Sequence, residues 1–401
     1  MRSIRVDVKD HDRPEGTASP ADIDPPSPRR RRSGQQNSKS AKGKRYPWRM
    51  RRRRLPAYGA LDLGTNNCRL LVAVPSGSGF RVIDAFSRIV RLGEGLGQTG
   101  VLGEAAMERT IDALHVCAAK LKRHGVQRSR LIATEACRRA GNGQDFLDRV
   151  RRETGLELEI VNQETEANLA VSGCAALLDP DSDHALVFDV GGGSSEFMWL
   201  RVRPQSGRDR EGGRREEQND NGHCGTWPQH EIKAWTSLPL GVVTLAERFG
   251  GVDVCERVFE EMVDFVRPYL EQFEAENRLI PAIRDRRVHL LGTSGTVTTI
   301  AGLHLKLQRY DRSRVDGCWL SRDDGAAVSR KLLAMDYDSR AASPCIGKER
   351  ADLVLAGCAI LEAVMRQWPC DRLRVADRGL REGILTRLMN EDGLIQAERT
   401  P

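Results

Sequence analysis

Short apolar runs separated by small polar turns begin at Tyr58. The segment YGALDLGTNNCRLLVAV (58–74) holds an apolar run, a turn around Gly64 and a second run rich in Leu and Val. Two such runs joined by a glycine-containing turn predict a pair of β-strands. FRVIDAFSRIVRL (80–92) continues the pattern and predicts a further strand.

The hydrophobic period changes between residues 103 and 124. Apolar side chains there recur three or four positions apart, at Met107, Ile111, Leu114, Ala118 and Leu121. This spacing places them on one face of an α-helix. The segment therefore predicts a helix that packs on the strands before it.

The same alternation of strand and helix patterns runs to the end of the chain. Strands are predicted in RLIATEACRRAGN (130–142), LELEIVN (156–162), HALVFDVGGGSSEFMWLRV (184–202), VHLLGTSGTVTTIAGL (288–303) and LRVAD (373–377). Helices are predicted over 143–154, 164–178, 351–368 and 381–389. The alternation predicts an α/β fold.

Two segments repeat one plan. ALDLGTNNCRLLVAV (60–74) and LVFDVGGGSSEFMWL (186–200) both consist of an apolar strand, an Asp-x-Gly turn and a second apolar strand, about 127 residues apart. The repeat predicts two related domains facing each other across a cleft. We place the first at 58–180, with a C-terminal helix at about 377–392 packing back on it, and the second at 181–376.

Charge separates the N-terminal segment from the rest of the chain. The net charge is +7, but residues 1–57 hold 17 Lys/Arg against 6 Asp/Glu, so the remaining 344 residues carry a net −4. With its Pro, Ser and basic runs, 1–57 is expected to be a disordered tail that could contact RNA or another polyanion. A polar, Gly-rich stretch at 204–230 predicts an inserted loop.

Composition narrows the class of protein. Hydrophobic residues make up 39% of the chain, and no run approaches the roughly 20 apolar residues of a membrane span. The ten cysteines show no CxxC pair and no regular framework. We therefore expect reduced thiols in a cytoplasmic protein without a membrane segment. A homodimer is a candidate assembly that the sequence does not decide.

Three small-residue turns are candidate phosphate sites, because backbone N–H groups can converge there on an anion. The first comprises Asp62, Gly64, Thr65, Asn66 and Asn67, with Arg69 at its edge. The second follows Asp189 and comprises Gly191, Gly192, Gly193, Ser194 and Ser195. The third comprises Gly292, Ser294, Gly295 and Thr296. Glycines in the second turn would permit close approach of a phosphate.

These turns belong to a longer series of motifs that resembles one enzyme family. ALDLGTNNCRLL, IATEACRRAGN, IVNQETEANLA, LVFDVGGGSSE, SLPLGVVTLAERF, LLGTSGTVTTIAGL and LRVADRGLREGIL follow one another from about residue 58 to 388. In this order they resemble the exopolyphosphatase/guanosine pentaphosphate phosphohydrolase family of the actin-like ATPase superfamily. The resemblance implies two actin-like (ribonuclease H-like) domains with an interdomain active site, in the short form without C-terminal helical domains.

The resemblance also implies the catalytic residues. The general base of the family matches Glu166, and a register slip would give the role to Glu164. The phosphate-contacting arginine matches Arg138, with Arg139 beside it as the alternative. Hydrolysis needs a water held in line with the terminal phosphorus and a group that accepts its proton, which a carboxylate can do.

Phosphoanhydride cleavage also calls for a divalent cation, and Mg²⁺ usually takes one or two carboxylates plus water and substrate. Asp189 is the preferred ligand, with Glu196 and Asp62 as companions. We expect hydrolysis of terminal phosphate from inorganic polyphosphate. The alternatives are removal of the 5′-phosphate of guanosine pentaphosphate, a catalytically inactive polyphosphate- or RNA-binding protein, and an actin-like ATPase or sugar kinase.

Overall fold

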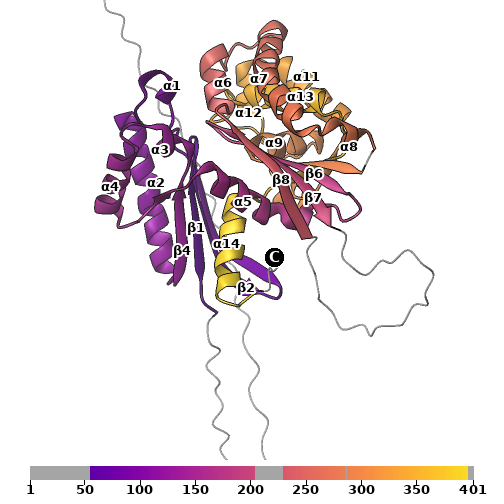
Figure 1. The fold of residues 1–401 in the computed structure, drawn as a ribbon. Coiled ribbons are helices and arrows are strands. Elements are labelled where there is room, and N and C mark those ends of the chain that lie inside the picture. Colours follow the sequence, from indigo (N-terminus) through magenta and orange to yellow (C-terminus); the bar gives the residue numbers. More distant parts are fainter. Residues whose placement is uncertain (1–54, 204–228, 286, 396–401) are drawn as a thin grey trace, which may run out of the picture. The chain divides into compact units, whose positions relative to one another are not determined.

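Two β-sheets carry the fold (Figure 1). The computed structural model describes residues 55–203, 229–285 and 287–395. Nearly all of the predicted tail (1–57) and most of the predicted insertion (204–230) lie outside these residues. Gln229 and His230 begin a strand, so the insertion ends two residues earlier than predicted.

The first sheet is five-stranded, in the order β3-β2-β1-β4-β5. Its strands are β1 (Tyr58–Leu63), β2 (Asn67–Ser76), β3 (Gly79–Ile89), β4 (Arg128–Ala133) and β5 (Glu159–Ile160). The first three strands are antiparallel, and β4 runs parallel to β1. The predicted strand pair and third strand are confirmed.

The second sheet is six-stranded, in the order β10-β11-β9-β6-β7-β8. Its strands are β6 (His184–Val190), β7 (Ser195–Arg203), β8 (Gln229–Leu238), β9 (Val288–Thr293), β10 (Trp319–Leu320) and β11 (Leu373–Ala376). It repeats the plan of the first sheet, because β6, β7 and β8 are antiparallel and β9 runs parallel to β6. Asp62 pairs with Arg69 across β1 and β2, and Asp189 pairs with Glu196 across β6 and β7. The α/β class and the sequence repeat are thereby confirmed, while the domain boundaries stay a prediction.

Helices alternate with the strands along the chain. Those that follow the first strands are α1 (Leu96–Thr99), α2 (Glu104–Arg123), α3 (Glu135–Arg139), α4 (Gly143–Thr154) and α5 (Gln163–Cys174). The later ones are α6 (Val242–Phe249), α7 (Glu256–Asn277), α8 (Ile280–Arg284), α9 (Gly295–His304), α10 (Arg312–Val315), α11 (Arg322–Leu333), α12 (Tyr337–Ala342), α13 (Val354–Gln367) and α14 (Leu380–Glu391). Within the described ranges, every helix is too short or too polar to span a bilayer.

The strand predicted over 130–142 is wrong beyond its first residues. β4 ends at Ala133, where its neighbour β1 also ends, and the N–H of Thr134 makes the last bond to Leu63. The other neighbour, β5, also ends at this level, and the backbone bonds of the following residues are made within a helix, α3.

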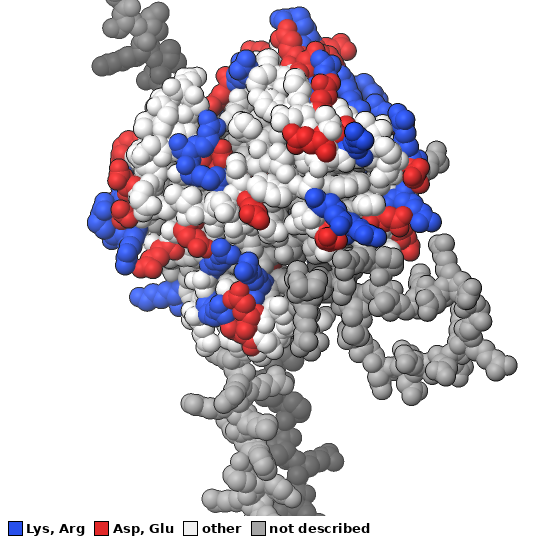
Figure 2. All heavy atoms as spheres, in the orientation of Figure 1, with Lys and Arg blue, Asp and Glu red and all other residues white. Residues whose placement is uncertain are grey.

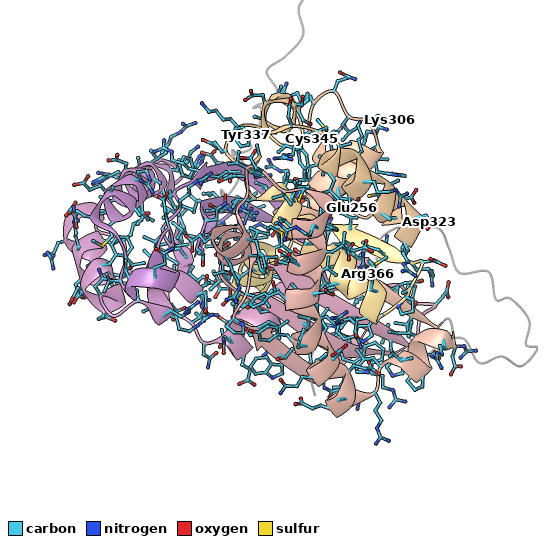
Figure 3. All side chains as sticks on the ribbon, turned by 90° about the horizontal axis from the view of Figure 1, so that it is seen from above. Glu256, Lys306, Asp323, Tyr337, Cys345 and Arg366 are labelled. Atoms are coloured by element: carbon cyan, nitrogen blue, oxygen red, sulfur yellow. The ribbon has the colours of Figure 1, made fainter. Side chains whose placement is uncertain are left out.

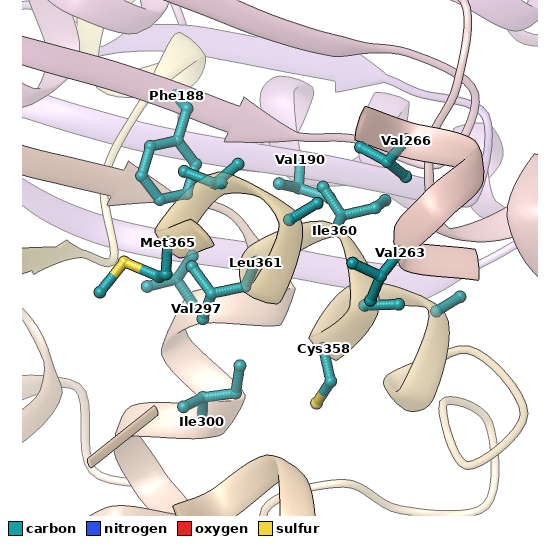
Figure 4. Packing of buried hydrophobic residues seen from close by; sticks show 14 of the residues in the cluster. Phe188, Val190, Val263, Val266, Val297, Ile300, Cys358, Ile360, Leu361 and Met365 are labelled. Carbon is teal, nitrogen blue, oxygen red and sulfur yellow. The ribbon is translucent and has the colours of Figure 1, made fainter. Parts of the chain in front are cut away.

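Each sheet buries both of its faces. One face of the first sheet packs on α2 and α4, and one face of the second packs on helices that include α7, α9 and α13. Figure 4 shows the latter core, where Phe188 and Val190 of β6 lie near Ile360 and Leu361 of α13. Apolar residues on both faces of the strands explain their nearly continuous hydrophobic runs.

Helices α5 and α14 cover the remaining two faces. α5 packs on the second sheet through Ala167 and Val171, and α14 packs on the first sheet through Ile384 and Leu385. The two helices also pack on each other (Figure 1). The C-terminal helix therefore joins the first sheet, although some 300 residues separate it from β1.

Candidate active site

The first loop (residues 64–67) joins β1 to β2. The N–H of Gly64 donates to the carbonyl O of Asn67 at 2.9 Å, and the carbonyls of Thr65 and Asn66 accept bonds from the segment that follows β3. The N–H groups of Thr65 and Asn66 donate to no acceptor among the described residues. The carbonyls are thus held in place, and these two donors remain available to an anion.

The second loop (residues 191–194) is held in the same way. The carbonyls of Gly191 and Gly192 accept bonds of 3.0 and 2.9 Å from the first two N–H groups of α6. A Cβ on Gly241 would lie 2.5 Å from the carbonyl O of Gly191, so only glycine permits this approach. The N–H groups of Gly192, Gly193 and Ser194 have no acceptor within the described ranges.

The two loops lie against each other. A Cβ on Gly192 would lie 3.1 Å from Cβ of Thr65 and 3.2 Å from Cβ of Asn66, and one on Gly193 would lie 2.7 Å from Oγ1 of Thr65. The missing side chains let two sets of free N–H groups come together. Such a concentration of donors can bind the oxygens of a phosphate group.

Both loops line a cavity of about 140 Å³, called the phosphate-loop cavity below. The carboxylates in its wall are those of Asp62, Glu135, Glu166, Asp189 and Glu196. Nearly all the predicted phosphate-binding residues line it: Asp62, Gly64, Thr65, Asn66, Asn67, Arg69, Gly191, Gly192, Gly193, Ser194, Ser294, Gly295 and Thr296. Ser195 and Gly292 do not. Both belong to strands, and Ser195 is fully buried behind the loop.

Glu166 enters the cavity from the first turn of α5, which begins with Asn162 accepting a bond from the N–H of Thr165. Burial, reinforced by repulsion from Glu196, raises the pKa of Glu166 well above its usual range. A carboxyl with a raised pKa accepts a proton more readily. Glu164, the alternative base, is exposed and does not line the cavity.

Arg138 lies behind Glu166 rather than in the cavity wall. Its guanidinium donates to Oε2 of Glu166 at 3.1 Å, to the carbonyl O of Val161 at 2.7 Å and to Oε2 of Glu135 at 2.6 Å. These bonds hold the carboxylates of Glu135 and Glu166 from outside the cavity. The geometry supports a positioning role on Glu166, and it does not support the predicted direct phosphate contact. Arg139 is exposed, and among the described residues its ion pair is with Glu135, at 3.7 Å.

Asp189 and Glu196 were predicted to hold a metal, and both line the cavity. Burial, with repulsion from a neighbouring carboxylate, raises the pKa of Asp189 to about 6 and that of Glu196 to about 7. Oγ of Ser237 donates to Glu196 at 2.9 Å. Burial likewise raises the pKa of Asp62, although Arg69 and Arg381 oppose the shift.

This donor set fits a hard divalent cation. Besides the carboxylates, the side-chain oxygens of Asn66 and Asn67, which line the cavity, are buried without a hydrogen-bond partner among the described residues. Across the described residues, no three His, Cys, Asp or Glu side chains already form a metal cluster. Mg²⁺ does not need such a preformed cluster, because it takes one or two carboxylates and completes its coordination shell with water and phosphate oxygens.

Two charged residues of the cavity wall were not predicted as part of the site. Glu135 is 5% exposed and accepts a bond from Arg138. The sequence signal for it was an acidic residue two positions after a strand. Arg350 precedes α13 and reaches the cavity from a distant part of the chain, which no local pattern indicates.

The third loop contains a strained residue. Ser294 has φ 116° and ψ 169°, a conformation that is almost restricted to glycine and costs about 1–3 kcal/mol. It precedes α9, and its side chain accepts a 3.3 Å bond from the N–H of Thr296. The strain thus lies directly in the cavity wall.

Comparison with known proteins identifies the family. The model of the Ppx/GppA phosphatase family matches residues 71–392. Exopolyphosphatase 2 of Mycobacterium tuberculosis is 28% identical over 82% of this chain and 98% of its own length. The guanosine-5'-triphosphate,3'-diphosphate pyrophosphatase of Aeromonas hydrophila is 26% identical over 84% of this chain and 60% of its own length.

A solved structure of the same family has a similar fold. The crystal structure of the Aquifex aeolicus member of this family superposes with a TM-score of 0.64 at 26% identity, over 84% of this chain and 98% of that one. The family model spans most of the chain and includes the second loop, whereas the first loop precedes the matched range. The resemblance seen in the sequence is thereby confirmed, and the chain belongs to the Ppx/GppA phosphatase family.

Proposed function

We propose that the protein releases terminal orthophosphate from inorganic polyphosphate by attack of a water that Glu166 activates. One observation carries the proposal: a largely buried carboxylate of raised pKa shares a small cavity with two loops, and most N–H groups of these loops have no acceptor among the described residues. Such a cavity combines donors for a phosphoryl group with a proton acceptor for water. The relative from M. tuberculosis bears the name of this activity.

Each group has a distinct task in this mechanism. The loop N–H groups bind the oxygens of the terminal phosphate and favour the charge that spreads over them in the transition state. Glu166 accepts the proton as the water attacks the terminal phosphorus, and the bond from this phosphorus to the bridging oxygen breaks, so that orthophosphate and the shortened polyphosphate are released. Arg138 holds the Glu166 carboxylate in place through its 3.1 Å bond, so that the acceptor is oriented before substrate arrives.

Asp189 and Glu196, with Asp62 beside them, would hold Mg²⁺. The ion would neutralise charge on the phosphate oxygens. Without it, the buried carboxylates would repel an anionic substrate. Burial, with repulsion between the neighbouring carboxylates as the second cause, raises the pKa values of Asp189 and Glu196.

A second candidate function is removal of the 5′-phosphate of guanosine pentaphosphate, which the Aeromonas relative favours. Phosphate release should be measured side by side on polyphosphate, guanosine pentaphosphate and ATP. We expect the highest kcat/KM on polyphosphate. A higher value on guanosine pentaphosphate would select the second candidate, and release from none of them would favour a binding protein without turnover.

The metal assignment predicts a defined Mg²⁺ dependence. Asp189→Asn should raise the Mg²⁺ concentration needed for half-maximal rate by at least about tenfold, because a ligand loses its charge. The measurement is a Mg²⁺ titration of phosphate release after chelation. Asp323→Asn, an exposed position on α11, is the control (Figure 3). An unchanged midpoint in the Asp189 variant would exclude it as a ligand.

A further inference from the structure

Residues 90–95, called the clasp segment below, directly follow β3 and hold the first loop. The N–H groups of Val90 and Arg91 both donate to the carbonyl O of Asn66, at 2.9 and 3.1 Å. The N–H of Gly93 donates to the carbonyl O of Thr65 at 2.9 Å. Three backbone bonds therefore tie the position of the first loop to that of the clasp segment.

The side chain of Arg91 reaches the turn that leads into α13. Its guanidinium donates to both carboxylate oxygens of Asp352, at 2.8 and 3.0 Å, and to the carbonyl O of Glu349 at 3.2 Å. Asp352 lies between Arg350 and Leu353, which both line the phosphate-loop cavity. The N–H of Leu353 closes this turn with a 3.0 Å bond to the carbonyl O of Arg350. Arg91 thus joins the first loop to another part of the cavity wall.

A second bond from the clasp segment reaches the helix that holds the second loop. The N–H of Gly95 donates to Oε1 of Glu247 in α6 at 2.9 Å. The first N–H groups of α6 in turn hold the carbonyls of Gly191 and Gly192. Six consecutive residues therefore connect the first loop with the second loop and with the turn before α13.

Arg91 has a backbone conformation that is unfavourable for arginine. Its φ is 49°, in the left-handed region that glycine adopts freely and that residues with a Cβ seldom adopt. Such strain persists only where the surrounding structure imposes it. Because glycine would fit this backbone better, the contact with Asp352 is what arginine supplies at this position.

The pair of Arg91 and Asp352 also differs from ordinary surface ion pairs. Figure 2 shows acidic and basic side chains interspersed over one face of the molecule. Pairs such as Arg387 with Glu391 join positions four residues apart on one helix, where an exposed pair stabilises little. Arg91 and Asp352 are 261 positions apart, and their side chains are 34% and 22% exposed. Their bidentate contact fixes both distance and orientation.

We propose that Arg91 is a positioning residue that holds the first loop in register with the second loop and with the turn before α13. This inference rests on the proposed function. The N–H groups of both loops must converge on one phosphoryl group in the transition state, and a small displacement of one set weakens the bonds of that set. Arg91 acts through Asn66 and Asp352 and contacts no substrate.

Arg91→Gly distinguishes a positioning role from a merely structural one. The change removes the guanidinium but relieves the backbone strain, so the midpoint of unfolding should change little. On polyphosphate, kcat should fall about tenfold while KM stays within about twofold, because the loop N–H groups themselves remain. Arg91→Lys keeps the charge without the bidentate contact and should restore part of kcat.

Arg278→Gly is the matched control, because it makes the same substitution in the same backbone conformation. Arg278 has φ 54°, follows α7 and is exposed, and its side chain has no ion pair among the described residues. Its variant should keep the kcat of the wild type. An unchanged kcat in Arg91→Gly, or an equal fall in both variants, would overturn the inference.

Asp352→Asn tests whether Arg91 acts through this contact. It should lower kcat by a similar factor, and the Arg91→Gly, Asp352→Asn double variant should fall no further, because both changes remove one interaction. Fully additive losses would show that the two residues act independently and would refute the proposed route.

Amide hydrogen exchange separates this inference from the proposed function. Exchange in the first loop, where the N–H of Gly64 bonds to the carbonyl O of Asn67, should become about tenfold faster in Arg91→Gly and stay unchanged in Arg278→Gly. If the wild type released phosphate from none of the substrates, the proposed function would fail, and exchange would still test the clasp segment. Equal exchange in the wild type and in Arg91→Gly would refute the positioning role.

Discussion

Glu166→Gln is expected to lower kcat for phosphate release by about 10²–10⁴-fold, the contribution of a positioned general base. The amide keeps the size of the side chain and can still contact Arg138, but it cannot accept the proton of the attacking water. KM should change little, because the loop N–H groups that bind the phosphate are untouched. The measurement is steady-state phosphate release on polyphosphate at saturating Mg²⁺.

Glu164→Gln is the control for this prediction. It lies two residues earlier in the same turn of α5, is exposed and is absent from the cavity wall. Activity should remain near that of the wild type. If instead the Glu164 variant lost activity and the Glu166 variant kept it, the assignment of the base would be reversed.

Gly173→Ala is expected to destabilise the protein by about 3 kcal/mol or to prevent folding, since overpacking against fixed backbone cannot relax. A Cβ at Gly173 of α5 would lie 1.8 Å from the carbonyl O of Gly379 and 2.9 Å from N of Gly383 in α14. The reciprocal contact is as tight, with a Cβ on Gly383 at 2.0 Å from the carbonyl O of Leu169. Backbone therefore meets backbone where the two helices cross.

The free energy of unfolding, measured by chemical denaturation, tests this prediction. Gly79→Ala is the matched control, because nothing lies within 4 Å of a Cβ there, and it should stay within about 0.5 kcal/mol of the wild type. A similarly small effect at Gly173 would show that the helices do not pack as described. The contact between the two helices also affects the candidate site, because α5 carries Glu166 and α14 begins with Leu380 and Arg381.

Much of the site was predictable because its requirements are local. A strand, an Asp-x-Gly turn and a second strand specify each loop from consecutive residues, and both predicted loops line one cavity. Glycine at positions 191–193 is a backbone requirement that is visible in the sequence. The misplaced residues Ser195 and Gly292 lie one or two positions inside strands, where strand ends are hardest to predict.

The sequence by itself determined the α/β class, the duplicated hairpins, the family and the candidate base, since each depends on neighbouring residues or on the order of motifs. Tertiary structure alone decided that Arg138 holds Glu166, that Glu135 joins the carboxylates, and that Arg69, Arg350 and Arg381 share one cavity. These three arginines come from β2, from the loop before α13 and from α14. Only long-range packing of the sheets and of α5 on α14 brings such distant charges together. The hydrophobic periodicity along the chain does not predict this packing.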